Sequence, residues 1–140
     1  DSPNNLKIVE RLGDISIHLN LLDKAIFYYQ MLTKLKPNEA NFYYKYGGAL
    51  GMKAKESNRF RALGMIGEVK ESFEKAIQLN PRHIEARWAL IELYLQLPRI
   101  IGGSEVKAKQ YANELYKLSA VAYTLKSSKF NFFNRFFAKL

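Results

Sequence analysis

The side chains that carry most enzyme chemistry are scarce in this sequence. It contains no cysteine, which excludes disulfides, thiolate metal sites and a cysteine nucleophile. The two histidines, His18 and His83, are far apart in the chain, and neither belongs to a metal-binding helical spacing such as H-E-x-x-H. His83 follows Pro81 at a predicted helix start, where we expect it to be exposed to solvent. No G-x-S-x-G motif is present. We therefore expect no catalytic centre, no metal site and no cofactor.

The glycine-rich segment GGALGMK (47–53) does not fit a phosphate-binding loop. Such a loop needs a preceding strand and the spacing G-x-x-x-x-G-K-[ST], and this segment has neither. Glycines also allow helices to approach each other closely. We expect this role for Gly47, Gly51, Gly64 and Gly67.

The net charge of the chain is strongly positive and unevenly distributed. There are 22 Lys and Arg residues against 13 Asp and Glu, a balance of +9. Such a charge favours acidic partners, among them nucleic acid, anionic lipid and acidic proteins. Residues 106–140 hold seven basic residues and one acid, Glu114, so the charge belongs largely to the C-terminal part. No apolar run approaches the roughly 18 residues that span a membrane.

Apolar and glycine positions recur at one fixed interval along the chain. The pairs that share this interval are Val9 and Tyr43, Leu12 and Tyr46, and Gly13 and Gly47. Pro37 and Pro81 each follow one apolar-periodic stretch and precede another, which indicates a turn between two helices.

This pattern resembles the tetratricopeptide repeat, a helix–turn–helix unit of about 34 residues. The matching positions are Leu12-Gly13, Ala25, Tyr29 and Pro37 in the first copy, Tyr43, Tyr46-Gly47, Phe73, Ala76 and Pro81 in the second, and Leu90, Tyr94, Ala108 and Leu115 in a looser third. The strings KYGGALGMKAKES (45–57) and EARWALIELYLQLP (85–98) look like bacterial tetratricopeptide proteins, which are often exported. The resemblance therefore favours an exported location slightly over a cytoplasmic one.

The expected fold is all-α: a right-handed α-solenoid of about three helical hairpins plus a C-terminal helix. We expect a single domain over residues 1–140. Its parts are repeat one at 6–39, repeat two with an insertion at 40–83, repeat three at 84–119 and a capping helix at 120–140.

Two departures from the repeat length carry structural expectations. Ten extra residues lie within 51–67, and we expect them to lengthen both helices of the second hairpin, with a turn near residues 56–58. The third repeat has about five extra residues in LPRIIGGSE (97–105). There Pro98 is expected to stop a helix, Gly102-Gly103 to form a turn, and Ser104 to cap the next helix.

The resemblance implies that the first helix of each hairpin lines a concave groove that binds a protein or peptide. The candidate groove residues are Lys7, Glu10, Asp14, His18, Asn41, Tyr44, Lys45, Glu85, Trp88, Glu92 and Gln96. Gly48 and Met52 lie on the same predicted face, and Trp88 could instead belong to the core. The implied function is a non-catalytic scaffold or adaptor whose partner the sequence does not name.

One subfamily grips the C-terminal carboxylate of chaperone tails with Lys, Asn and Arg side chains in this groove. This chain has Glu10 and Asp14 at the first two of those positions, and Glu85 and Ala89 at the last two. We therefore do not expect it to bind chaperone tails. An acidic groove favours a basic or polar ligand that tolerates aromatic contacts.

The last segment, SSKFNFFNRFFAKL (127–140), is basic and rich in phenylalanine. Written as a helix, it places apolar side chains on one face, and its candidate interaction residues are Phe130, Phe133, Arg135 and Phe137. A capping helix is the first interpretation. The alternatives are an oligomer formed by docking into a second copy, binding to an anionic membrane, and binding to single-stranded nucleic acid.

Overall fold

The computed structural model describes residues 3–118, and within that range the chain is entirely helical. The elements are α1 (Pro3–His18), α2 (Leu22–Leu35), α3 (Ala40–Glu56), α4 (Arg59–Leu79), α5 (Ile84–Gln96), the short 3₁₀ helix η1 (Arg99–Ile101) and α6 (Glu105–Leu118). The predicted all-α helical-repeat class is therefore confirmed, whereas the right-handed sense of the solenoid stays a prediction.

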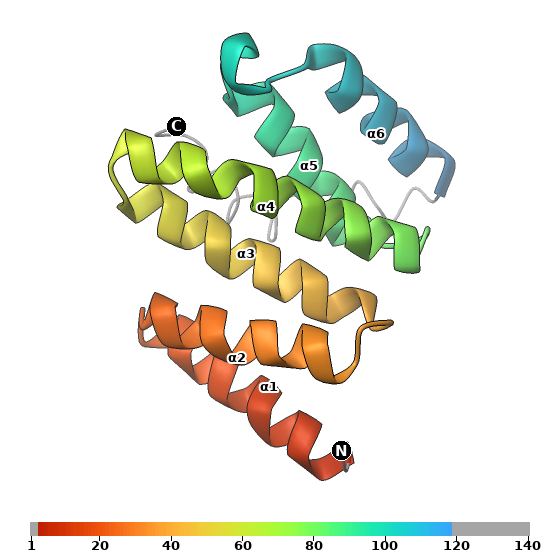
Figure 1. The fold of residues 1–140 in the computed structure, drawn as a ribbon. Helices are drawn as coiled ribbons and strands as arrows, with labels where there is room; N and C mark the ends of the chain where they lie inside the picture. Colours follow the sequence, from red (N-terminus) through yellow and green to blue (C-terminus); the bar gives the residue numbers. More distant parts are fainter. Residues whose placement is uncertain (1–2, 119–140) are drawn as a thin grey trace.

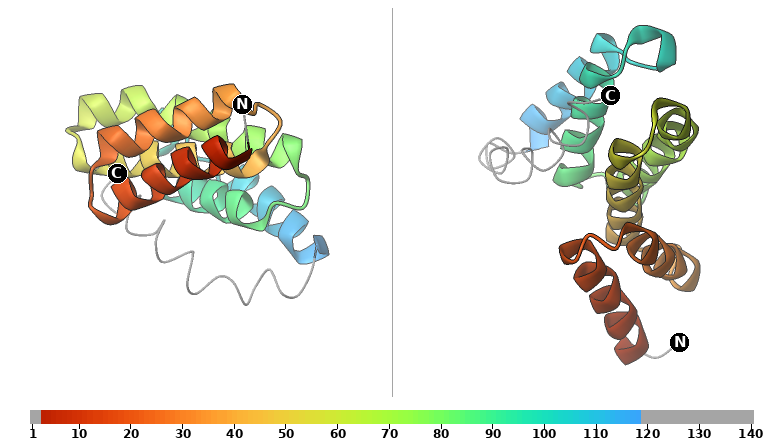
Figure 2. Two further views of the ribbon diagram at one scale, coloured as in Figure 1. Left: turned by 90° about the horizontal axis from the view of Figure 1, so that it is seen from below. Right: turned by 90° about the vertical axis from the view of Figure 1, so that its left-hand side faces the viewer.

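The helices stack in chain order, with α1 at one end of the described part and α6 at the other (Figure 1). Each helix packs against the next one along the chain, so that α2 and α4 join successive hairpins by contacting α3 and α5. The right-hand view of Figure 2 shows the same succession. A single hairpin cannot bury its apolar face alone, and this stacking supplies the missing contacts.

Small residues on one helix accommodate large residues on its partner. A Cβ atom on Gly13 would overlap the ring of Tyr29, and one on Gly47 would lie 3.0 Å from both Phe73 Cε1 and Ser72 Cβ. The role expected for Gly47, close helix contact, is confirmed. Glycine lets the backbones approach until the aromatic rings fill the space between them.

The same expectation is wrong for Gly64 and Gly67. Both are exposed on α4, and a Cβ atom at either would meet no described atom within 4 Å. The reason is helical geometry: the buried face of α4 is formed by Ala62, Ile66 and Val69, and the two glycines lie on other faces.

The ten extra residues are absorbed by helix rather than loop. Helix α3 continues for nine residues beyond Gly47, whereas α1 continues for five beyond Gly13. Helix α4 begins ten residues before Val69, whereas α2 begins three before Ala25. The α3–α4 turn falls at residues 57–58, close to where the sequence predicts it.

The connection from α5 to α6 follows the expected turn chemistry. Helix α5 ends just before Pro98, and Gly102 adopts a φ of 107°, in the left-handed region that favours glycine. The Ser104 Oγ accepts a hydrogen bond of 3.2 Å from the Lys107 backbone N–H. Ser104 thus caps α6 as predicted.

His83 is buried, so the expectation of solvent exposure is wrong. Its Nδ1 accepts a hydrogen bond of 3.1 Å from the Ala86 backbone N–H, which makes it the N-cap of α5. The imidazole ring also lies against Tyr44, with ring centroids 5.2 Å apart. A helix start needs an acceptor for its free N–H groups, and here an imidazole supplies it.

Candidate partner-binding site

Two carboxylates of α1 share a lysine from α3. Glu10 and Asp14 lie one turn apart on α1, and Lys45 Nζ is 2.9 Å from Glu10 Oε2 and 2.8 Å from Asp14 Oδ1. The Tyr29 hydroxyl of α2 donates a 2.7 Å hydrogen bond to the same Asp14 oxygen. Three predicted groove residues thus meet, joined by a tyrosine that the sequence pattern assigns to packing. We call these four side chains the charged cluster.

The charged cluster keeps one net negative charge. Burial alone would lower the pKa of Lys45, but its hydrogen bonds to Asp14 and Glu10, together with their charges, raise it above its ordinary value. Burial and the hydrogen bond to Asp14 raise the pKa of Tyr29, so its hydroxyl stays protonated. Two carboxylates therefore face one ammonium group at neutral pH.

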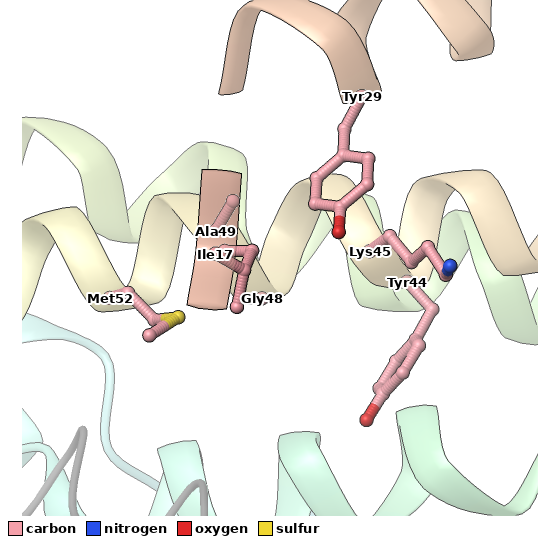
Figure 3. A pocket seen from close by; sticks show the side chains of 7 residues that line it. All are labelled: Ile17, Tyr29, Tyr44, Lys45, Gly48, Ala49 and Met52. Carbon is pink, nitrogen blue, oxygen red and sulfur yellow. The ribbon is translucent and has the colours of Figure 1, made fainter. Parts of the chain in front are cut away.

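A mainly apolar hollow of about 140 Å³ adjoins the charged cluster (Figure 3). The described residues that line it are Ile17 of α1, Tyr29 of α2, and Tyr44, Lys45, Gly48, Ala49 and Met52 of α3. A Cβ atom on Gly48 would meet no described atom within 4 Å. Two residues, Tyr29 and Lys45, belong to both the hollow and the charged cluster.

A second, more polar hollow lies where α3 and α5 begin. Asn41 and Glu85, both predicted groove residues, line it together with His83. Burial, followed by the charge of Glu85, raises the pKa of the neighbouring Tyr44. The structure thus brings Asn41 and Glu85 to one surface beside the first hollow.

Trp88 and Glu92 are buried, at 7% and 3% exposure, and Trp88 is part of the hydrophobic core. The Glu92 carboxylate accepts a 2.8 Å hydrogen bond from Gln96 Nε2. Burial raises the pKa of Glu92, although the hydrogen bond from Gln96 opposes this. Every residue from Ala86 to Tyr94 is buried, so these two side chains offer little surface to a ligand.

The remaining predicted residues lie apart from the charged cluster or outside the described range. Lys7 is exposed on α1. His18 is also exposed, and its Nδ1 lies 2.8 Å from the Asp14 carbonyl oxygen. The tail residues Phe130, Phe133, Arg135 and Phe137 lie outside the described residues.

The sequence pattern did not predict a partly buried ion pair between α5 and α6. Arg87 of α5 is buried, and its Nη2 lies 3.1 Å from Oε1 of Glu114 on α6. The same guanidinium group donates a hydrogen bond to the His83 carbonyl oxygen. A signal was present, because Glu114 is the single acid after residue 105. A charge within an apolar helix needs such a partner.

Within residues 3–118, no group of three or more His, Asp or Glu side chains could hold a metal ion. No helix in the described range is long and apolar enough to cross a bilayer.

The helix pair α1–α2 coincides with a known repeat family. Residues 6–39 match the family model described as Tetratricopeptide repeat. The chain contains a tetratricopeptide repeat. Tetratricopeptide repeats generally mediate protein–protein interactions, and the family is typically non-catalytic. No curated protein matches the chain.

Proposed function

We propose that this chain is a non-catalytic scaffold or adaptor that binds a protein segment in a groove along α1, α3 and α5. The observation that carries the proposal is the apolar hollow beside the charged cluster. Both lie within and next to the matched tetratricopeptide repeat, a type of unit that generally mediates protein–protein interactions.

The chemistry of the hollow selects the ligand side chain. Its volume is close to that of a cavity of roughly 150 Å³ that takes up benzene in another protein. Tyr29, Tyr44 and Met52 would surround an aliphatic or aromatic group, and such contacts are common at interface anchors. The ligand therefore presents one apolar or aromatic side chain.

The charged cluster selects what stands next to that side chain. Its net negative charge favours a Lys or Arg of the ligand and disfavours a carboxylate. Glu85, half-buried near the second hollow, adds to the same preference. We therefore propose a basic segment with an apolar or aromatic anchor, and not an acidic C-terminal tail.

Selection from a random peptide library displayed on phage tests this ligand chemistry. We expect the enriched peptides to share an apolar or aromatic residue with a Lys or Arg beside it. Enrichment of acidic peptides, or of none, would contradict the proposal.

A plug variant then tests the location of binding. Gly48→Leu extends a side chain into the hollow from a position where a Cβ atom meets no described atom within 4 Å, and leucine is a better helix former than glycine. We expect it to weaken an enriched peptide at least about tenfold in fluorescence anisotropy, the loss of one anchor. The matched control is Gly64→Leu on α4, where a Cβ atom also meets no described atom within 4 Å. Equal affinity of the two variants would place binding elsewhere.

A charge variant tests the charged cluster separately. Glu10→Gln keeps the shape of the side chain and removes one negative charge. We expect it to weaken peptides with a basic residue and to leave variants with Ser at that position unchanged. Trp88→Ala is unsuitable for this purpose because Trp88 is buried and its truncation would test packing.

A further inference from the structure

Helix α1 presents a continuous apolar stripe to solvent. Four large aliphatic side chains share one face of this helix or its immediate end, at intervals of four, three and four residues. They are Ile8, Leu12, Ile15 and Leu19, with exposed fractions of 57%, 38%, 53% and 63%. This face points away from the packed side of α1, where Gly13 meets Tyr29.

The same face is covered on the next hairpin. The positions one repeat further along the chain, Phe42, Tyr46 and Ala49 on α3, are all buried. The covering element is α2, the second helix of the preceding hairpin: Gln30 Nε2 donates a 3.3 Å hydrogen bond to Tyr46 Oη.

The counterpart of the last residue of the stripe is half-buried and contacts α2. Leu19 corresponds to Lys53, whose Nζ lies 3.1 Å from Oδ1 of Asp23 on α2. On α5 the counterparts of Ile8, Leu12 and Ile15 are Ala86, Leu90 and Leu93, which are buried too. The stripe is therefore the α1 version of a face that packs against a helix in both other hairpins.

We propose that this stripe binds a second copy of the same chain, with the two α1 helices antiparallel. The spacing of four, three and four residues is symmetric about the midpoint between Leu12 and Ile15, so it is the same from either end of the helix. A two-fold axis between Leu12 and Ile15 therefore sets Ile8 opposite the partner's Leu19, and Leu12 opposite the partner's Ile15. Such a surface is self-complementary, as a two-fold symmetric interface requires.

The stripe itself carries no charge that would oppose its burial. The stripe contains no charged side chain, so that pairing two stripes buries no unpaired charge. Arg11 flanks it on one side and is exposed, and at the rim of an interface it stays solvated.

The size of the stripe sets the expected strength. A 16-residue helix is about 24 Å long, and one helix pair buries less than the roughly 1,600 Å² of a standard interface. We therefore expect a reversible dimer with a dissociation constant of about 1–100 μM, below the affinity of standard-sized interfaces.

Sedimentation velocity of the full 140-residue chain between about 1 μM and 1 mM tests the association, a range that brackets the expected constant. We expect the average mass to rise toward that of a dimer. Ile15→Glu should weaken dimerisation at least about tenfold, because both copies bury the new charge. The matched control, Leu95→Glu on α5, changes a side chain of equal exposure, 53%, and should leave the dimer unchanged. Circular dichroism checks that both variants remain folded.

Cysteine cross-linking tests the direction of pairing, since the chain has no cysteine of its own. In the antiparallel register the two Ile8 positions are about 16 Å apart along the helices, too far for a disulfide. A mixture of Leu12→Cys and Ile15→Cys chains should form a mixed disulfide readily, and so should a mixture of Ile8→Cys and Leu19→Cys. Ile8→Cys alone should not cross-link.

Three outcomes would overturn the proposal. The first is a chain that stays monomeric at every concentration, as it would if another protein covered the stripe. The second is a dimer that persists in Ile15→Glu. Such a dimer could form through residues 127–140, in which case only their removal would abolish it. The third is efficient cross-linking of Ile8→Cys with itself, which indicates a parallel pair.

Discussion

At the scale of single residues, the glycines occupy two opposite environments. Gly13 lies where any side chain would collide with the ring of Tyr29, whose hydroxyl group is held by Asp14. Gly67 lies on an exposed face of α4 with open space around it. The repeat spacing supports close contact only at Gly13, which recurs as Gly47, whereas Gly67 is not among the matching positions of the repeat. Their difference depends on which face of the helix is buried.

This contrast predicts opposite effects of the same substitution. Gly13→Ala should destabilise the chain by about 1–3 kcal/mol, because the added methyl group overpacks a filled contact. Gly67→Ala should stabilise it by about 0.5–1 kcal/mol, since alanine loses less backbone entropy in a helix. Urea unfolding followed by circular dichroism measures both. Equal effects of the two substitutions would refute the packing assigned to Gly13.

Because Glu92 is buried, we expect the free energy of unfolding to depend on pH. Burial raises its folded-state pKa above the ordinary value of 4.5. The stability that this group contributes is therefore fully present below pH 4.5 and lost as the pH rises through the raised pKa. Glu92→Gln, which can still accept the hydrogen bond from Gln96, should remove this loss and be more stable than the wild type at neutral pH. Thermal unfolding from pH 4 to 8 measures it.

The control for this prediction is Glu71→Gln, at an exposed position on α4. It should leave the pH profile of the wild type unchanged. A wild type whose stability does not fall across this range, or an identical profile for Glu92→Gln, would count against a raised pKa at Glu92.

At the scale of elements, the ends of helices are set by local residue types and can therefore be predicted from the sequence. The turn after α3, the stop at Pro98 and the cap at Ser104 were all predictable, because Gly, Pro and short polar side chains punctuate helices. The burial of His83 was not predictable in this way. Its exposure depends on Tyr44, which lies in a different hairpin.

The cap of α4 gives a prediction at this scale. Asn58 Oδ1 accepts a 3.0 Å hydrogen bond from the Arg61 backbone N–H. Asn58→Ala should cost about 1 kcal/mol, the typical value of an N-cap, whereas Asn58→Asp should keep the stability because it retains the acceptor. Chemical denaturation of the three proteins measures the difference. A loss of equal size in both variants would show that the cap is not what matters at this position.

The charged cluster also illustrates what repeat spacing can predict. Lys45 is separated in sequence from both Glu10 and Asp14 by close to one repeat length. Residues one repeat apart occupy equivalent positions on adjacent hairpins, so the three side chains lie side by side. That proximity was predictable. The burial of Trp88 was left open and that of Glu92 was not predicted, because α5 is apolar on nearly all sides and its pattern singles out no exposed face.

At the scale of the whole molecule, the main contacts in the described part of the chain join each helix to the next one along the stack. In such arrays stability is close to a sum of hairpin and junction contributions, and different parts can open separately. The α1–α2 and α5–α6 hairpins should therefore respond independently to local damage.

Hydrogen–deuterium exchange tests this independence. Gly13→Ala should speed amide exchange in α1 and α2 and leave α5 and α6 at the wild-type rate, because the main contacts of α1 and α2 are with each other and with α3. The α5–α6 pair has its own anchor, the ion pair of Arg87 and Glu114. Faster exchange by the same factor in all helices would instead show that the chain opens as a single unit.

The lengthened α3–α4 hairpin has a practical consequence for protein engineering. From Val69 to its end, α4 runs for ten residues, as α2 does from Ala25, so the inserted turns lie at the far tip and leave the junctions between hairpins in register. The chain has thus already accepted an insertion there. The turn at Ser57 and Asn58 is accordingly the place where the chain should best tolerate a further inserted segment, such as a fluorescent reporter.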